Sequence, residues 1–89
     1  MKAIVTVLGK DQVGIIASVC ALLSEHNINI EDISQTVLQE YFTMVMLVDL
    51  SDCTSSIGEV GEALELAGKQ KGLSIRIQRE DIFNAMHRI

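Results

Sequence analysis

The sequence predicts an α+β fold with the element order β-α-β-β-α-β. Four stretches show the period-two pattern of strands, and two longer stretches repeat apolar residues with the period of a helix. Two of the strand-like stretches are apolar on both faces, as expected of strands that are covered on both sides. The strand-like stretches are 2–8, 28–38, 41–50 and 73–78, and the helical stretches are 12–26 and 56–71.

The first helix is predicted from about residue 12 to residue 26. Asp11 is placed to cap its start through a following backbone N–H, and Asn27 suits the left-handed conformation that ends many helices. The apolar residues at helical spacing form the face expected to meet the sheet. They are Ile15, Ile16, Val19, Leu22 and Leu23.

The second and third strands are expected to form a hairpin with Gln39-Glu40 as its connection. Ile28 and Ile30 share a face, but Ile33 is out of phase by one residue. That shift predicts a β-bulge at Glu31-Asp32.

The second helix is predicted from a capping box. Ser56 and Glu59 have the spacing of this motif, and the helix should run to about Lys71 before Gly72 ends it. The last strand follows, and residues 81–89 form a short tail with helical spacing of apolar residues. A helix of this length is marginal alone. We therefore expect Ile82, Phe83 and Met86 to dock on the domain or on a neighbouring subunit.

Two β-α-β units with right-handed crossovers give a ferredoxin-like βαββαβ sandwich, with an antiparallel sheet in the order 4-1-3-2 and two helices on one face. This topology makes the first and third strands central, and these are the two that are apolar on both faces. We expect a domain over residues 1–80 and a C-terminal tail helix over 81–89. A second subunit is the simplest cover for the helix-free face of the sheet.

Composition limits the possible partners. The formal net charge is −5, and the seven basic residues are scattered, which argues against binding to nucleic acids or anionic membranes. An apolar fraction of 48% in a small domain favours a homo-oligomer. With no apolar run of membrane-spanning length and only two distant cysteines, Cys20 and Cys53, we expect a cytoplasmic protein with reduced thiols. No cofactor and no metal site are expected.

The segment between the first strand and the first helix is the one place where local physics suggests a ligand. Gly9, Asp11 and Gly14 lie within a few residues of each other there. A helix start offers unpaired backbone N–H groups, and its dipole favours a negative charge. The sequence therefore predicts a site for a small anion or a carboxylate.

Asp11-Gln12-Val13-Gly14-Ile15-Ile16 after a strand, followed one helix later by Asn27-Ile28-Asn29-Ile30, resembles the ACT domain, a small regulatory module that binds amino acids or other metabolites. The likeness spans about residues 2–79, and the tail resembles that of short stand-alone bacterial and archaeal ACT proteins. The resemblance implies a ligand site at Asp11, Val13, Gly14 and Asn29. In ACT dimers such sites commonly lie at a subunit interface.

Each of these residues also has a purely structural interpretation. Asp11 can be a helix cap, Gly14 can allow close packing of helix on strand, and Asn29 can be an edge residue of its strand. If Asp11 contacts the ligand, it is suited to an ammonium group, and Asn29 can both donate and accept hydrogen bonds.

Enzymes and nucleic-acid-binding proteins of this fold carry residues that this chain lacks. Residues 9–14 contain neither an arginine to hold phosphate nor a Cys-x-x-Cys pair for a metal, and the first strand has no aromatic residue for base stacking. We therefore expect no catalytic residues. Two functions remain: an amino-acid-binding regulatory module that signals to a separate protein, and a structural oligomerisation module without a ligand.

Overall fold

The computed structural model describes residues 1–10 and 13–82. Within these residues the chain forms four strands and two helices in the predicted order. The elements are β1 (Lys2–Lys10), α1 (Ile15–Glu25), β2 (Asn29–Leu38), β3 (Tyr41–Asp49), α2 (Ile57–Lys71) and β4 (Ser74–Arg79). A helical turn at residues 80–82 follows β4.

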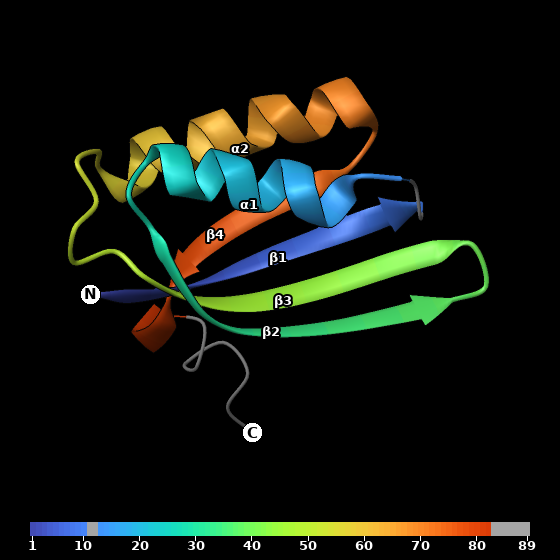
Figure 1. The fold of residues 1–89 in the computed structure, drawn as a ribbon, viewed down its shortest axis with the longest axis horizontal. Coiled ribbons are helices and arrows are strands. Elements are labelled where there is room, and N and C mark those ends of the chain that lie inside the picture. Colours follow the sequence, from blue (N-terminus) through green and yellow to red (C-terminus); the bar gives the residue numbers. More distant parts are fainter. Residues whose placement is uncertain (11–12, 83–89) are drawn as a thin grey trace.

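The sheet is antiparallel in the order β2-β3-β1-β4, which is the predicted order. Both helices lie on one face, and the turn at 80–82 lies on the other side of the sheet (Figure 1). The central strands β1 and β3 are the two that the sequence marks as apolar on both faces. The predicted fold class is confirmed.

The core lies between the sheet and the two helices. From β1, Ala3, Val5 and Val7 are fully buried, while the residues between them are only half-buried, as the alternation of side chains in a strand requires. The core is aliphatic apart from Phe42. Its buried members from the other elements are Ile15, Val19, Leu23, Ile28, Phe42, Met44, Met46, Val48, Leu50, Val60, Leu64, Leu73 and Ile75.

Helix α1 differs from its prediction at the N-terminal end. It begins at Ile15, with Gly14 in the N-cap position, about three residues later than the periodicity indicates. Ile16 belongs to the predicted inward stripe, yet 38% of it is exposed, because Ile15, Val19 and Leu23 are the residues that meet the sheet. At the other end Asn27 has φ 57°, the left-handed conformation predicted for it.

The β-bulge in β2 and both ends of α2 are as the sequence predicts. The register of β2 against β3 shifts between Ile30 and Asp32, which confirms the bulge. Helix α2 begins with the predicted cap, because the Oγ of Ser56 accepts a hydrogen bond from the backbone N–H of Glu59 at 3.2 Å. It ends at Gly72, which has φ 70°.

Candidate ligand-binding site at the start of helix α1

The first backbone N–H groups of α1 receive no side-chain cap from the described residues. The first intrahelical bond runs from the N–H of Ser18 to the carbonyl oxygen of Gly14 at 2.9 Å, so the N–H groups of Ile15, Ile16 and Ala17 precede it. Among the described residues no side chain caps them, and the first turn contains no acidic residue. These donors, together with the helix dipole, favour an anion at this point.

Gly14 is required by backbone conformation and not by close packing. Its φ is 85°, in the left-handed region where side chains are disfavoured. Among the described residues, none beyond its chain neighbours lies within 4 Å of a Cβ built on it. Close packing against the described residues therefore does not explain this glycine. Gly9 is the opposite case, because a Cβ there would clash with the Leu73 side chain and approach the carbonyl oxygen of Gly72 at 3.4 Å.

The other loop residues fall partly outside the described part of the chain. Val13 is fully exposed beside Gly14, so its side chain can contact a ligand there. Asp11 lies outside the described residues. Its capping role and its contact with a ligand ammonium both stay predictions.

Asn29 does not lie near this loop in the same chain. It opens β2 opposite Asp49, which in turn lies opposite Lys2 at the start of β1. The loop follows the other end of β1, whose nine residues span about 26 Å at about 3.3 Å per residue. Gly14 and Asn29 of one chain therefore cannot contact the same small ligand.

The residues that do neighbour the loop come from the β2–β3 hairpin. Lys10, the last residue of β1, lies opposite Tyr41, and Tyr41 lies opposite Leu38. Tyr41 is 51% exposed and Leu38 is 71% exposed. The sequence pattern gave no reason to select Tyr41 and Leu38 as site residues. The predicted antiparallel pairing of the first and third strands, however, would have indicated that the start of β3 lies beside the loop.

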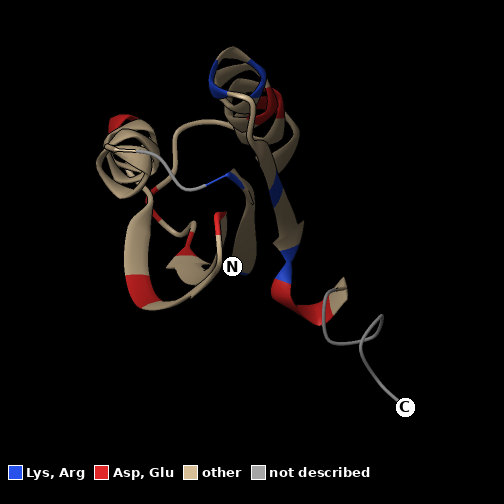
Figure 2. Ribbon diagram, turned by 90° about the vertical axis from the view of Figure 1, so that its right-hand side faces the viewer, with Lys and Arg blue, Asp and Glu red and all other residues tan. Residues whose placement is uncertain are grey.

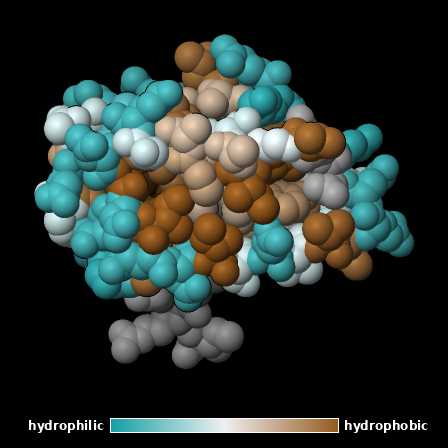
Figure 3. All heavy atoms as spheres, viewed as in Figure 1, coloured by the Kyte–Doolittle hydropathy of each residue, from teal (hydrophilic) through white to brown (hydrophobic). Residues whose placement is uncertain are grey.

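An exposed apolar surface joins α1 to the outer strand β2. We call it the α1–β2 patch, and it consists of Ile16, Ile33 and Val37, which are 38%, 41% and 52% exposed. In the space-filling view, apolar surface gathers on the face formed by α1 and β2 (Figure 3). Strand β2 is an edge strand, so one row of its backbone groups is open to another chain.

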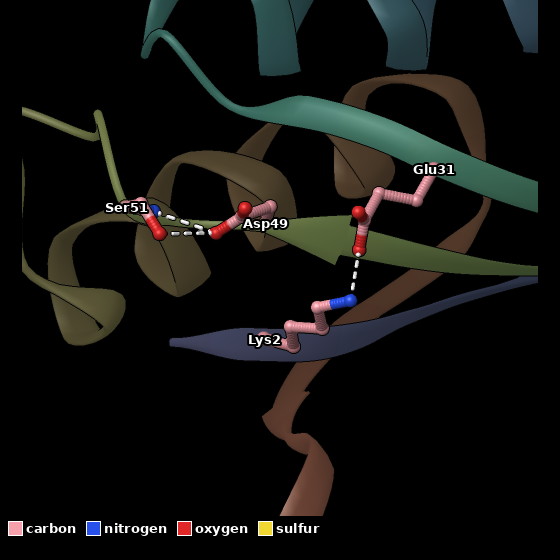
Figure 4. Close-up of polar contacts among 4 residues, drawn as sticks. All are labelled: Lys2, Glu31, Asp49 and Ser51. Carbon is pink, nitrogen blue, oxygen red and sulfur yellow. Dashed lines mark hydrogen bonds and ion pairs between the residues drawn. The ribbon is translucent and has the colours of Figure 1, made fainter.

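A polar network lies on the helix-free face at the far end of the sheet. The Nζ of Lys2 is 2.9 Å from the Oε1 of Glu31, an ion pair that reaches from β1 to β2 over β3 (Figure 4). The hydrogen bond and charge of Glu31 raise the pKa of Lys2, with smaller contributions from Glu80 and Asp49. The hydroxyl and backbone N–H of Ser51 donate to Asp49 at 2.6 and 2.9 Å and lower its pKa.

Two cysteines and a histidine are further polar side chains of interest among the described residues. Cys20 and Cys53 are half-buried free thiols, and Cys53 donates to the carbonyl oxygen of Ser55 at 3.3 Å. The Nδ1 of His26 is 3.2 Å from the Oγ of Ser55. Within residues 1–10 and 13–82 no group of histidines, cysteines and carboxylates could hold a metal ion.

A groove of about 620 Å³ lies between α2 and β4, at the edge of the sheet opposite β2. It contains none of the residues that the sequence assigns to the site. Its lining contains both acidic and basic side chains, and Glu65 and Lys69 lie 3.8 Å apart. Basic and acidic segments are likewise interspersed along α2 and around the end of β4 (Figure 2).

Neither helix of the described part of the chain has the length and apolar character that a membrane-crossing helix needs.

Comparisons with known proteins agree with this geometry. A model of the ACT domain matches residues 2–78. A UPF0237 protein of Clostridium acetobutylicum is 58% identical over 89 residues, which cover 100% of both chains. A UPF0237 protein of Methanopyrus kandleri is 52% identical over 88 residues, covering 99% of this chain and 98% of the relative.

A solved structure of similar length shows the same fold. The ACT domain protein from Streptococcus pneumoniae is 46% identical, with a TM-score of 0.82, and the match covers 98% of both chains. The relatives span archaea and bacteria and match almost from end to end. This chain belongs to the ACT domain family, the family of small regulatory domains that its helix start and element order indicate.

Proposed function

We propose that this protein is a regulatory module that binds an amino acid at the start of α1 and acts as a homo-oligomer on a separate protein. One observation carries the proposal. The first turn of α1 offers N–H groups that no described side chain caps, beside a left-handed glycine whose Cβ position no described residue crowds. Such a helix start binds a carboxylate without any basic side chain.

The neighbours of this helix start suit the rest of an amino acid. Val13, Tyr41 and Leu38 expose apolar and aromatic surface around the end of β1. Asp11, by its place in the sequence, is suited to the ligand ammonium. An α-amino acid combines these three features: a carboxylate, an ammonium group and a side chain of moderate polarity.

The second wall of the site comes, in this proposal, from another copy of the chain. Antiparallel pairing of two β2 edges about an axis near Ile33 and Ser34 would set Asn29 of a second copy beside Leu38, at the loop end of the sheet. The same pairing would bury the α1–β2 patch. Asn29 would thus join the site across the interface, although it cannot do so within one chain.

Regulation then requires that ligand binding change the assembly. A ligand held by two chains binds the paired state more tightly than the separate chains, and it shifts the population toward pairs. A partner protein that binds only the paired state would then respond to changes in the ligand concentration. This scheme needs no catalytic residue.

The test is a calorimetric screen of the twenty amino acids, followed by a matched pair of variants at Gly14. Gly14→Asp and Gly14→Asn impose nearly the same size and backbone strain, but only the aspartate repels a ligand carboxylate. We expect the ligand-induced rise in melting temperature to be lost in Gly14→Asp and retained in part in Gly14→Asn. Equal behaviour of the two variants would show that no carboxylate sits at the start of α1.

The second candidate is an oligomerisation module without a ligand. The open edge of β2 and the α1–β2 patch favour it, because both can hold two copies together with nothing bound. A stable dimer by light scattering that binds none of the twenty amino acids would support this function over the first.

A further inference from the structure

The helix-free face of the sheet is apolar where the central strands meet. Ile4 on β1 and Leu47 on β3 lie directly opposite each other, and both belong to the side of the sheet turned away from the core. Val45 lies on the same side, one pleat further along β3. These side chains are only half-buried, and they are flanked by polar groups at the end of the sheet. An antiparallel sheet that faces water is usually polar there.

The chain leaves β4 beside this apolar area. Gln78 pairs with Ile4 and Arg79 with Ala3, and the helical turn at 80–82 begins at the next residue, below the sheet (Figure 1). The guanidinium of Arg79 binds both carboxylate oxygens of Asp81, at 2.7 and 3.2 Å. This pair links the last residue of β4 to the turn, and Ile82 is 45% exposed at the end of the turn.

The rest of the chain has the length and pattern to cross that area. Seven residues follow Ile82, and as a helix they would span about 10 Å. Two strand spacings, from β4 over β1 to β3, also amount to about 10 Å. At helical spacing Ile82, Phe83, Met86 and Ile89 fall on one side, within an arc of about 120°. His87 and Arg88 fall outside this arc.

We propose that residues 83–89 of each chain continue the turn at 80–82 as a helix and pack across the helix-free face of their own sheet, with Phe83 and Met86 on Ile4 and Leu47. The expectation from sequence alone was a second subunit on this face. The point where β4 ends, together with the match of lengths, favours the chain's own tail. The sheet would then be covered on both faces, and β2 would remain open for assembly.

The first test is methyl NMR of the full chain. We expect nuclear Overhauser contacts between the ring of Phe83 and the methyl groups of Ile4 and Leu47. A sample mixed from differently labelled chains separates contacts within one chain from contacts between two. Contacts found only between chains would assign the face to a second copy, and their absence from both samples would leave the tail undocked. Either result overturns the proposal.

The second test uses a matched pair of double variants. Phe83→Ser with Met86→Ser removes apolar contacts, whereas the control, His87→Ser with Arg88→Ser, changes the polar side of the same segment. We expect only the first to move the methyl resonances of Ile4, Val45 and Leu47, with the core methyls of Leu64 unchanged. Unmoved sheet resonances in the first variant would contradict the proposal, as would equal movement in both.

Discussion

At the scale of single residues, two glycines of this chain occupy their positions for different physical reasons. At Gly9 a Cβ would meet the Leu73 side chain and approach the carbonyl oxygen of Gly72, whereas Gly14 adopts a φ of 85° that favours glycine. The sequence shows two glycines near an aspartate and cannot distinguish these causes. The close approach at Gly9 depends on residues more than sixty positions away in the chain, which no local pattern reveals.

Asp49 offers a prediction at this scale. Its pKa is lowered by the hydroxyl and the backbone N–H of Ser51, so its ionised form is favoured in the folded protein. The resulting stability is present above the ordinary pKa of an aspartate and is lost as the pH falls through the lowered value. Ser51→Ala removes the hydroxyl donor and should raise the pKa of Asp49 toward normal, measured by NMR titration of its carboxyl carbon. An unchanged titration would assign the shift to the backbone donor alone.

At the scale of elements, the two helices show what makes a helix start predictable. Helix α2 begins where its capping box places it, because Ser56 and Glu59 form a local motif that needs no tertiary contact. Helix α1 begins at Ile15 after an N-cap glycine, about three residues later than the apolar periodicity indicates. The β-bulge, the hairpin and the C-terminal ends of both helices were also predictable, because each depends on a local sequence motif.

The N-cap of α2 can be tested by removing the hydroxyl of Ser56. Ser56→Ala removes the oxygen that accepts the N–H of Glu59, and it should lower the free energy of unfolding by about 1 kcal/mol. Urea unfolding followed by circular dichroism measures this loss. Ser55→Ala is a matched control, since the hydroxyl of Ser55 contacts His26 and does not cap the helix. A loss of similar size in both variants would mean that the cap is not the cause.

At the scale of the whole molecule, the topology was predictable, whereas the distance between Gly14 and Asn29 within one chain was not. Both central strands were correctly assigned, because a strand buried on two faces has apolar residues at successive positions of its sequence. Along the chain, only helix α1 separates Asn29 from the loop. A β-α-β unit, however, returns the chain to the end of the sheet where it began. The distance between Gly14 and Asn29 is set by this reversal of the chain direction, and local sequence patterns do not show it.

The proposed assembly through β2 can be tested by placing a charge in the α1–β2 patch. Ile33→Lys places a charge in the α1–β2 patch beside the open edge, and we expect it to shift the protein to monomers in light scattering. Leu66→Lys is the control, because Leu66 is 61% exposed on α2, away from this edge. A dimer that persists in Ile33→Lys and dissociates in Leu66→Lys would move the interface to the helices.

The separation of Gly14 and Asn29 by the length of a strand has one more consequence. In the proposed pair each copy lends Asn29 to the other, so the two-fold axis creates two identical sites at once, and a single chain holds only half of each. Dilution of the protein would then empty the sites at constant ligand concentration. A sensor built this way responds to the abundance of its own polypeptide as well as to the metabolite, and it stays silent until enough copies have been synthesised to meet.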